Sequence, residues 1–293
     1  MRILLLGKYG QLGWELHRAL LPLGEVQALD YPEIDLAKPE SLREIIRTSA
    51  PNVIVNATAY TAVDKAESER ELAFAINADS PRVMAEEARN INAVLIHYST
   101  DYVFDGKKGT PYVEIDLPNP LNVYGESKLQ GERAIQVVDG AFLILRTAWV
   151  YSLRRDSFVT KVLQWARQEE TLRIVDDQIS NPTWARTLAQ TTALLIAKAN
   201  SDVVGWLAER KGIYHLAGDG FASRLEWAKA ILQLDPNQSE QISRELLTAR
   251  TSDFPTPAIR PLFSALECGN FTDRFGLRLP DWEGSLSLAM ARL

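Results

Sequence analysis

Short apolar runs alternate with stretches of helical periodicity through the first half of the chain. The runs predict buried strands at residues 2–6, 25–29, 52–56, 93–98 and 142–147. Apolar positions at helical spacing predict helices between them, at residues 14–21, 41–48, 69–90 and 124–137. Strands that are apolar on both faces belong to parallel sheets covered by helices. The order therefore predicts an α/β fold with a Rossmann-like, doubly wound parallel sheet.

The pattern changes after Tyr151. It predicts helices at residues 157–168 and 185–199 and strands at 172–175 and 213–216, the last as one more strand of the main sheet. The remaining stretch is rich in proline and polar residues. We expect a dinucleotide-binding domain in residues 1–150, joined by parts of 171–218. We expect residues 151–293 mainly to form a smaller C-terminal α/β domain that binds substrate.

Composition excludes several classes of protein. The 293 residues carry a net charge of −6 with both signs interspersed, which gives no electrostatic footprint for nucleic acid or an anionic membrane. No apolar run approaches the ~18 residues of a membrane span, and the first one is too short for a secretion signal. The single cysteine, Cys268, permits no intrachain disulfide and suits a reducing compartment. We expect a cytoplasmic protein with neither nucleic-acid nor membrane partners.

A glycine-containing turn follows the first predicted strand. Gly7, Gly10 and Gly13 are spaced G-x-x-G-x-x-G between strand and helix. Glycines permit a tight turn there and let backbone N–H groups approach a pyrophosphate at the helix N-terminus. The position predicts a dinucleotide site. Glycine spacing alone is weak support, and the order strand, turn, helix strengthens it.

Two residues bear on the choice of cofactor. Asp30 comes directly after the second strand, where a carboxylate can accept hydrogen bonds from the ribose hydroxyls of NADH. A solvated loop aspartate is the alternative interpretation. Lys8, beside the glycine turn, could instead meet the 2′-phosphate of NADPH. The sequence therefore predicts NADPH or NADH and leaves the choice open.

Tyr124 and Lys128 lie four residues apart on one face of a predicted helix. Tyrosine has a pKa near 10 in water, and a nearby ammonium group would favour its phenolate and bring proton transfer into range. Thr100 follows the fourth strand, at the sheet edge where ligands bind in such folds. We predict that these three residues form the catalytic set. The alternative for Thr100 is a residue that caps a turn.

Other chemistries are less well supported. The histidines His17, His97 and His215 are far apart in sequence and do not have metal-ligand spacing. We expect His17 and His97 to be structural. Neither a P-loop nor a G-x-S-x-G elbow is present. We therefore assign no metal-binding residues.

Longer stretches carry a family resemblance. They include LLGK…GWEL at residues 5–16, VNATAYTAVDKAE at 55–67, HYSTDYVF at 97–104, PLNVYG at 120–125 and RTAWVY at 146–151. Later matches are DQ at 177–178, PT at 182–183, PTPA at 255–258 and LPDW at 279–282. The chain resembles the extended short-chain dehydrogenase/reductase superfamily and, within it, the dTDP-4-dehydrorhamnose reductases. The resemblance spans nearly the whole chain.

The resemblance implies NAD(P)H-dependent reduction of the C4 keto group of dTDP-4-dehydro-β-L-rhamnose to dTDP-β-L-rhamnose. Tyr124 would be the proton donor, with Lys128 beside it. Substrate contacts would come from Thr100, Asp101, Tyr124 and Trp149, with Arg260 as the candidate for the diphosphate. Cofactor contacts would come from a larger set: Gly7, Gly10, Gln11, Leu12, Gly13, Asp30, Asp35, Leu36, Ala59, Tyr60, Thr61, Tyr124 and Lys128.

The chain departs from the family pattern in two places. Related enzymes can dimerise around Mg²⁺ held by glutamates. Glu15 is kept here, but Arg186 stands where the resemblance would place another acid, and a cation cannot ligate Mg²⁺. Mg²⁺ binding is therefore doubtful, and either a monomer or a homodimer is compatible with the sequence. The usual pair of arginines near position 260 is reduced to Ile259-Arg260.

Two alternative functions remain. The first is another nucleotide-sugar reductase or epimerase of the same superfamily. The second is a non-catalytic regulatory subunit, because the resemblance extends to the β subunit of methionine adenosyltransferase. The intact Thr100, Tyr124 and Lys128 favour the enzyme.

Overall fold

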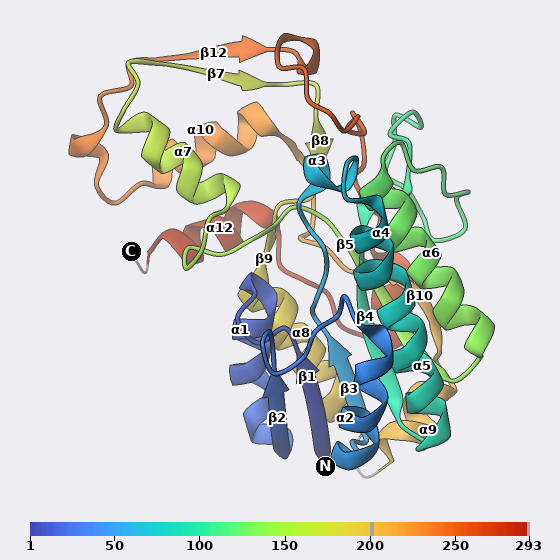
Figure 1. Ribbon diagram of the computed structural model, residues 1–293. Coiled ribbons are helices and arrows are strands. Elements are labelled where there is room, and N and C mark those ends of the chain that lie inside the picture. The colour runs from blue at the N-terminus through green and yellow to red at the C-terminus, as the bar shows by residue number, and fades with distance from the viewer. Residues whose placement is uncertain (200–201, 292–293) are drawn as a thin grey trace.

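The computed structural model describes residues 1–199 and 202–291. Its main sheet has six parallel strands in the order β10-β5-β4-β3-β1-β2, which confirms the predicted doubly wound fold (Figure 1). The strands are β1 (Arg2–Leu6), β2 (Glu25–Leu29), β3 (Val53–Asn56), β4 (Val94–Thr100), β5 (Ala141–Thr147) and β10 (Gly212–His215). As predicted, the chain returns to this sheet for β10 after a long excursion.

Helices cover both faces of the sheet because successive side chains of each strand point to opposite sides. Ile3 and Leu5 of β1 pack on one face, while Leu4 and Leu6 pack on the other. The first face is covered by α1 (Gln11–Leu20), α8 (Ala185–Lys198) and α9 (Val203–Ala208). The second is covered by α2 (Leu42–Ser49), α5 (Ser80–Asn90) and α6 (Val123–Val138).

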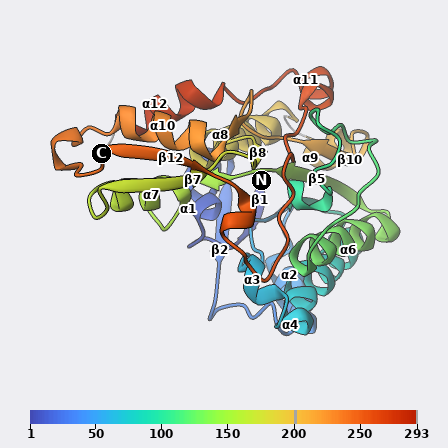
Figure 2. The same cartoon turned by 90° about the horizontal axis from the view of Figure 1, so that it is seen from above.

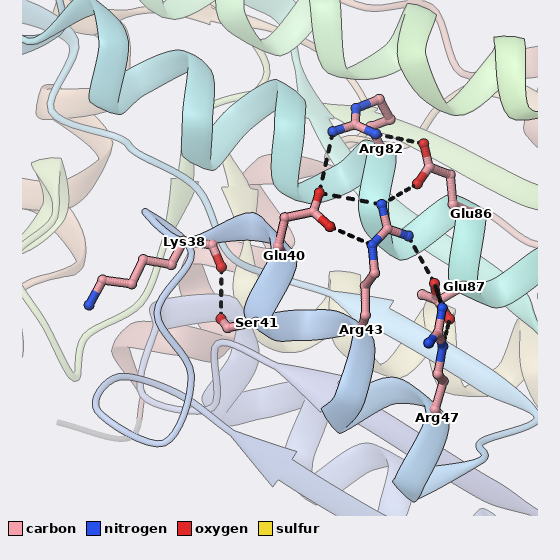
Figure 3. Close-up of polar contacts among 8 residues, drawn as sticks. All are labelled: Lys38, Glu40, Ser41, Arg43, Arg47, Arg82, Glu86 and Glu87. Carbon is pink, nitrogen blue, oxygen red and sulfur yellow. Dashed lines mark hydrogen bonds and ion pairs between the residues drawn. The ribbon is translucent and has the colours of Figure 1, made fainter.

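An ion-pair network fastens α2 to α5 (Figure 3). The buried Glu87 carboxylate accepts hydrogen bonds from Arg43 Nη1 at 2.8 Å and Arg47 Nε at 2.6 Å. Arg43 also donates to Glu86 and Glu40. These arginines lower the pKa of the Glu87 carboxyl, so it remains charged although it is buried. The network holds the helix layer of this face together.

The predicted helix over residues 69–90 is interrupted. It consists of α4 (Arg70–Phe74), a π-helical turn at Ala75–Asp79, and α5. Within the turn, Asn77 Oδ1 accepts a hydrogen bond from the Tyr60 backbone at 2.9 Å. Gly131 allows α6 to pack closely against this turn, since a Cβ at position 131 would lie 2.1 Å from Asn77 O. The turn therefore fixes the segment that follows β3.

A smaller lobe lies beyond the carboxyl ends of the main strands (Figure 1). Its apolar core lies among α7 (Phe158–Ala166), α10 (Arg224–Leu234) and α12 (Trp282–Met290). The predicted strand at 172–175 is β7 (Thr171–Val175), which pairs with β12 (Glu245–Ala249) and not with the main sheet. Figure 2 shows this pair beside α7 and α10. Ser157 and Ser223 cap α7 and α10.

Several further elements are short. They are α3 (Val63–Ala66), α11 (Gly269–Phe275), β6 (Val150–Tyr151), β8 (Ile179–Ser180), β9 (Thr183–Trp184) and β11 (Ala222–Ser223). The strands form two small pairs, β6 with β9 and β8 with β11. Among the described residues, no helix is long and apolar enough to cross a membrane.

Candidate functional site

A cavity of about 1050 Å³ runs along the carboxyl ends of the main strands. It brings together most of the residues predicted from sequence. Those lining it are Gly7, Gly10, Gln11, Leu12, Asp30, Asp35, Leu36, Ala59, Thr61, Thr100, Asp101, Tyr124, Lys128 and Trp149. Gly13, Tyr60 and Arg260 do not line it.

The glycine turn leaves the first helix open toward this cavity. Gly10 is the N-cap of α1 and offers no side chain to it. Within the described residues, the N–H groups of Gln11 and Leu12 have no protein acceptor. Free N–H groups at a helix N-terminus attract anions. The turn therefore fits the diphosphate of a dinucleotide.

Gly13 packs directly against the backbone of this turn. A Cβ on Gly13 would lie 1.8 Å from Gly7 O, so only glycine allows α1 to pack this closely against the turn. Gly7 itself has a φ of +94°, a conformation that side chains disfavour. The structure thus gives Gly13 a packing role, and its contact with a cofactor stays a prediction.

Asp30 and Lys8 differ in how far their charges are available. The Asp30 carboxylate lines the cavity and accepts the backbone N–H groups of Tyr9 and Tyr31, each at 2.8 Å. Lys8 Nζ lies 2.5 Å from Glu33 Oε2. The lysine considered for the 2′-phosphate is therefore already paired with a carboxylate.

Tyr60 is not part of the cavity lining. Its hydroxyl donates to Glu69 Oε2 at 2.5 Å, and its backbone is held by Asn77. Burial and the Glu69 carboxylate raise the pKa of Tyr60 to about 12. The neighbouring Ala59 and Thr61 line the cavity in its place.

The Tyr-x-x-x-Lys pair lies on α6, whose start is fixed by a cap. Asn122 Oδ1 accepts the Gly125 N–H at 2.8 Å, and this places Tyr124 in the first turn. Lys128 is only 2% exposed, and its Nζ donates to Tyr98 O at 2.7 Å. Burial lowers the pKa of Lys128 to about 8. Its amine is thus held in one position at the cavity wall.

A buried histidine stands behind Lys128. His97 Nε2 lies 3.2 Å from Lys128 Nζ, and its Nδ1 lies 2.9 Å from Asn56 Nδ2. Asn56 Oδ1 accepts the Thr58 N–H, which orients the amide. Burial lowers the pKa of His97 well below its usual value, so the ring is neutral. From the sequence, we expected His97 to be only structural. Its contact with Lys128 arises because α6 packs against β4, the strand that carries His97.

The Tyr124 side chain is half-buried in the wall of the cavity. Burial raises its pKa, although a hydrogen bond with the Thr100 side chain opposes the rise. Lys128 is not among the groups that shift the pKa of Tyr124, so the lowering that we expected from it is not observed. A protonated phenol suits a group that gives a proton to a substrate.

Thr100 and Asp101 form a buried hydroxyl–carboxylate cluster. Thr100 Oγ1 donates to Asp101 Oδ1 at 3.1 Å. Asp101 Oδ2 accepts from Ser180 at 3.1 Å and Ser264 at 2.5 Å. Burial raises the Asp101 pKa, and these donors oppose the rise. Asp101 therefore joins β4 to segments from the second half of the chain, a partnership that the sequence did not reveal.

Trp149 follows β5 and lines the cavity in a strained conformation. Its φ is 39°, which is rare for a large side chain and costs on the order of 1–3 kcal/mol. One face stacks on Trp227, with ring centroids 5.5 Å apart. Arg224 also lies over the ring, at 3.6 Å from its centroid. The aromatic stack fixes the indole at the boundary between the two lobes.

Residues 1–293 match the family model described as RmlD substrate binding domain. The chain belongs to this family. It is 42% identical over 290 residues to dTDP-4-dehydrorhamnose reductase of Escherichia coli strain K12, covering 97% of this chain and 95% of that one. Identity to the enzyme of Burkholderia thailandensis is 40%, covering 100% and 99%.

A solved structure agrees with the sequence comparison. The dTDP-4-dehydrorhamnose reductase of Bacillus anthracis strain Ames, in complex with NADP, superposes with a TM-score of 0.89 at 30% identity. The two structures cover 100% and 99% of their chains. The resemblance stated from sequence is confirmed.

At the two positions where the sequence departs from the family pattern, the arginines form ion pairs. Arg186 Nε lies 3.3 Å from Glu15 Oε2, so the glutamate that we considered for Mg²⁺ forms an ion pair. Within the described residues, no group of three His, Cys, Asp or Glu side chains could hold a metal. Arg260 pairs with Asp64 through two contacts of 2.9 and 2.7 Å.

Proposed function

We propose that this chain catalyses the NAD(P)H-dependent reduction of the C4 keto group of dTDP-4-dehydro-β-L-rhamnose to dTDP-β-L-rhamnose. One observation carries the proposal: Thr100, Tyr124 and Lys128 converge on the cavity that begins at the open N-terminus of α1. Full-length identity near 40% to curated reductases supports the substrate.

The N–H groups of Gln11 and Leu12 would hold the diphosphate of the cofactor, and Asp30 would accept ribose hydroxyls. The reduced nicotinamide, when bound, supplies the hydride. The chain supplies the proton, because Tyr124 donates its phenolic hydrogen to the carbonyl oxygen at C4. Lys128, fixed on Tyr98 O, stabilises the phenolate that remains.

The two parts of the molecule would divide the binding task. We assign NAD(P) binding to residues 1–150 with β10 and α8, and substrate recognition mainly to residues 151–293. The separate apolar core of α7, α10 and α12 supports this division. We further propose that the enzyme acts in the cytoplasm as a monomer or homodimer on a dTDP-sugar. Its single cysteine is consistent with a reducing compartment.

The test is a turnover assay with purified protein, NADPH and dTDP-4-dehydro-β-L-rhamnose, followed by the absorbance of NADPH. The expected product, identified by NMR, is dTDP-β-L-rhamnose. Tyr124→Phe is the matched control because it removes one hydroxyl group. Turnover of a different nucleotide sugar alone would favour another reductase or epimerase, and binding without turnover of any such sugar would favour a regulatory subunit.

A further inference from the structure

A loop from the second half of the chain crosses the glycine turn. It joins β6 to α7 and spans residues 152–157. The Ser152 N–H donates to Gln11 Oε1 at 2.7 Å, and Arg155 Nη1 donates to Tyr9 O at 2.6 Å. Arg154, Arg155 and Asp156 line the cavity. The loop therefore brings cationic side chains to the part of the cavity next to the glycine turn.

Arg155 lies at the ribose end of this region. The Tyr9 carbonyl accepts from Arg155, while the Tyr9 N–H donates to Asp30 Oδ2 at 2.8 Å. A single residue thus separates the guanidinium from the carboxylate that would meet the adenosine ribose. In dinucleotide-binding folds, an arginine close to this acid accommodates a 2′-phosphate.

The charge of Arg155 is available to a ligand. Across the part of the chain that the structure describes, no carboxylate lies within ion-pair distance of it, whereas Lys8 is paired with Glu33. The guanidinium has five N–H donors, and the Tyr9 carbonyl occupies one. Its planar fork matches phosphate oxygens better than an ammonium group does. The neighbouring Arg154 lies over the Trp14 ring.

We propose that Arg155 binds the 2′-phosphate of NADPH. The inference rests on the proposed NAD(P)H-dependent reduction and adds the residue that holds the 2′-phosphate when the phosphorylated cofactor binds. Asp30 favours free ribose hydroxyls, and Arg155 offsets its repulsion of a phosphate. One site then accepts both NADH and NADPH.

The test measures binding without turnover, by calorimetry on Arg155→Met, Arg155→Lys and the wild type. The ligands are NADPH and NADH, and adenosine 2′,5′-bisphosphate and adenosine 5′-monophosphate (AMP). The two members of each pair differ only by the phosphate at the 2′ position. Lys161→Met is the control, because this exposed lysine of α7 carries the same charge outside the cavity lining. Thermal melting of each variant verifies folding.

We expect Arg155→Met to weaken NADPH and the bisphosphate by roughly 10–100-fold. NADH and AMP should change by less than about threefold, given that one charge-assisted contact is lost only by the phosphorylated ligands. Arg155→Lys should recover part of the loss, and Lys161→Met should match the wild type.

Two results would overturn the inference. An equal loss for NADH and NADPH would place Arg155 on the diphosphate that both share, and unchanged affinities would remove it from the site. The proposed function has a separate outcome. If Arg155→Met discriminates between the ligands but no dTDP-keto-sugar is reduced, the substrate assignment fails and Arg155 keeps its role.

Discussion

Replacing Gly13 with alanine probes the packing that supports the cofactor turn. The new Cβ would lie 1.8 Å from Gly7 O and 2.6 Å from Gly7 C. Real Cβ atoms essentially never approach closer than 3.0 Å, so the two segments must separate by more than an ångström. The atoms in the way are backbone and cannot rotate aside.

The cost follows from this overlap. Added methyl groups in packed regions cost about 1–3 kcal/mol, and a rigid backbone obstacle points to the upper end of that range. For a protein of this size, about 3 kcal/mol corresponds to a fall in Tm of roughly 6–12 °C. The displacement also disturbs the Gly10 N–H bond to Gly7 O and the open N-terminus of α1. NADPH affinity should therefore fall by at least about tenfold, which is the loss of one good hydrogen bond.

The assay combines thermal unfolding by circular dichroism with fluorescence titration of NADPH. Gly212→Ala in β10 is the matched control, because its new methyl group would meet the Tyr214 ring at 3.4 Å, an ordinary contact. We expect the control to melt close to the wild type. A Gly13→Ala protein with wild-type Tm and NADPH affinity would refute the packing argument.

Three further predictions address catalysis, pH and assembly. Tyr124→Phe should lower kcat by ~10²–10⁴-fold, because general acid help is lost, and leave NADPH affinity intact; unchanged turnover would refute its role. Burial lowers the Lys128 pKa from 10.5 to about 8. Between these values the unfolded chain binds more protons, so the stability of the ligand-free protein should rise with pH, by up to ~1.4 kcal/mol per unit. Lys128→Met should lose this slope in denaturant titrations, and parallel slopes would contradict the assignment. Because Arg186 pairs with Glu15, activity should survive EDTA and light scattering should give the same mass with and without Mg²⁺; a chelator-driven fall from dimer to monomer would show the opposite.

The main strands could be located along the chain because each is a short apolar run, whereas their order within the sheet comes from the structure. The carboxyl ends of parallel strands meet at one edge, so Gly7, Asp30 and Thr100 could be placed near one another without coordinates. The π-helical turn could not be predicted. Residues 69–90 have a continuous helical pattern. The interruption depends on the hydrogen bond between Asn77 and Tyr60 and on the close packing of α6 that Gly131 allows.

The sequence also could not show which cationic side chains are already paired with a carboxylate. Lys8 and Arg155 are both cations near the glycine turn, but only the structure shows that Glu33 pairs with Lys8. Arg260 is likewise paired, with an acid 196 positions away, Asp64. A motif identifies which side chains reach a site, while long-range pairing decides which of them still have free donors for a ligand.

The separate apolar core of the smaller lobe has a consequence for engineering. Residues 151–184, 222–231 and 282–290 contribute to the core of the smaller lobe. The intervening segments 188–199, 203–216 and 271–279 pack against the main sheet. Neither lobe is therefore one continuous segment that could be excised or exchanged between relatives as a unit. A new sugar preference must therefore be built by substituting individual side chains, because segments of the two lobes alternate along the chain.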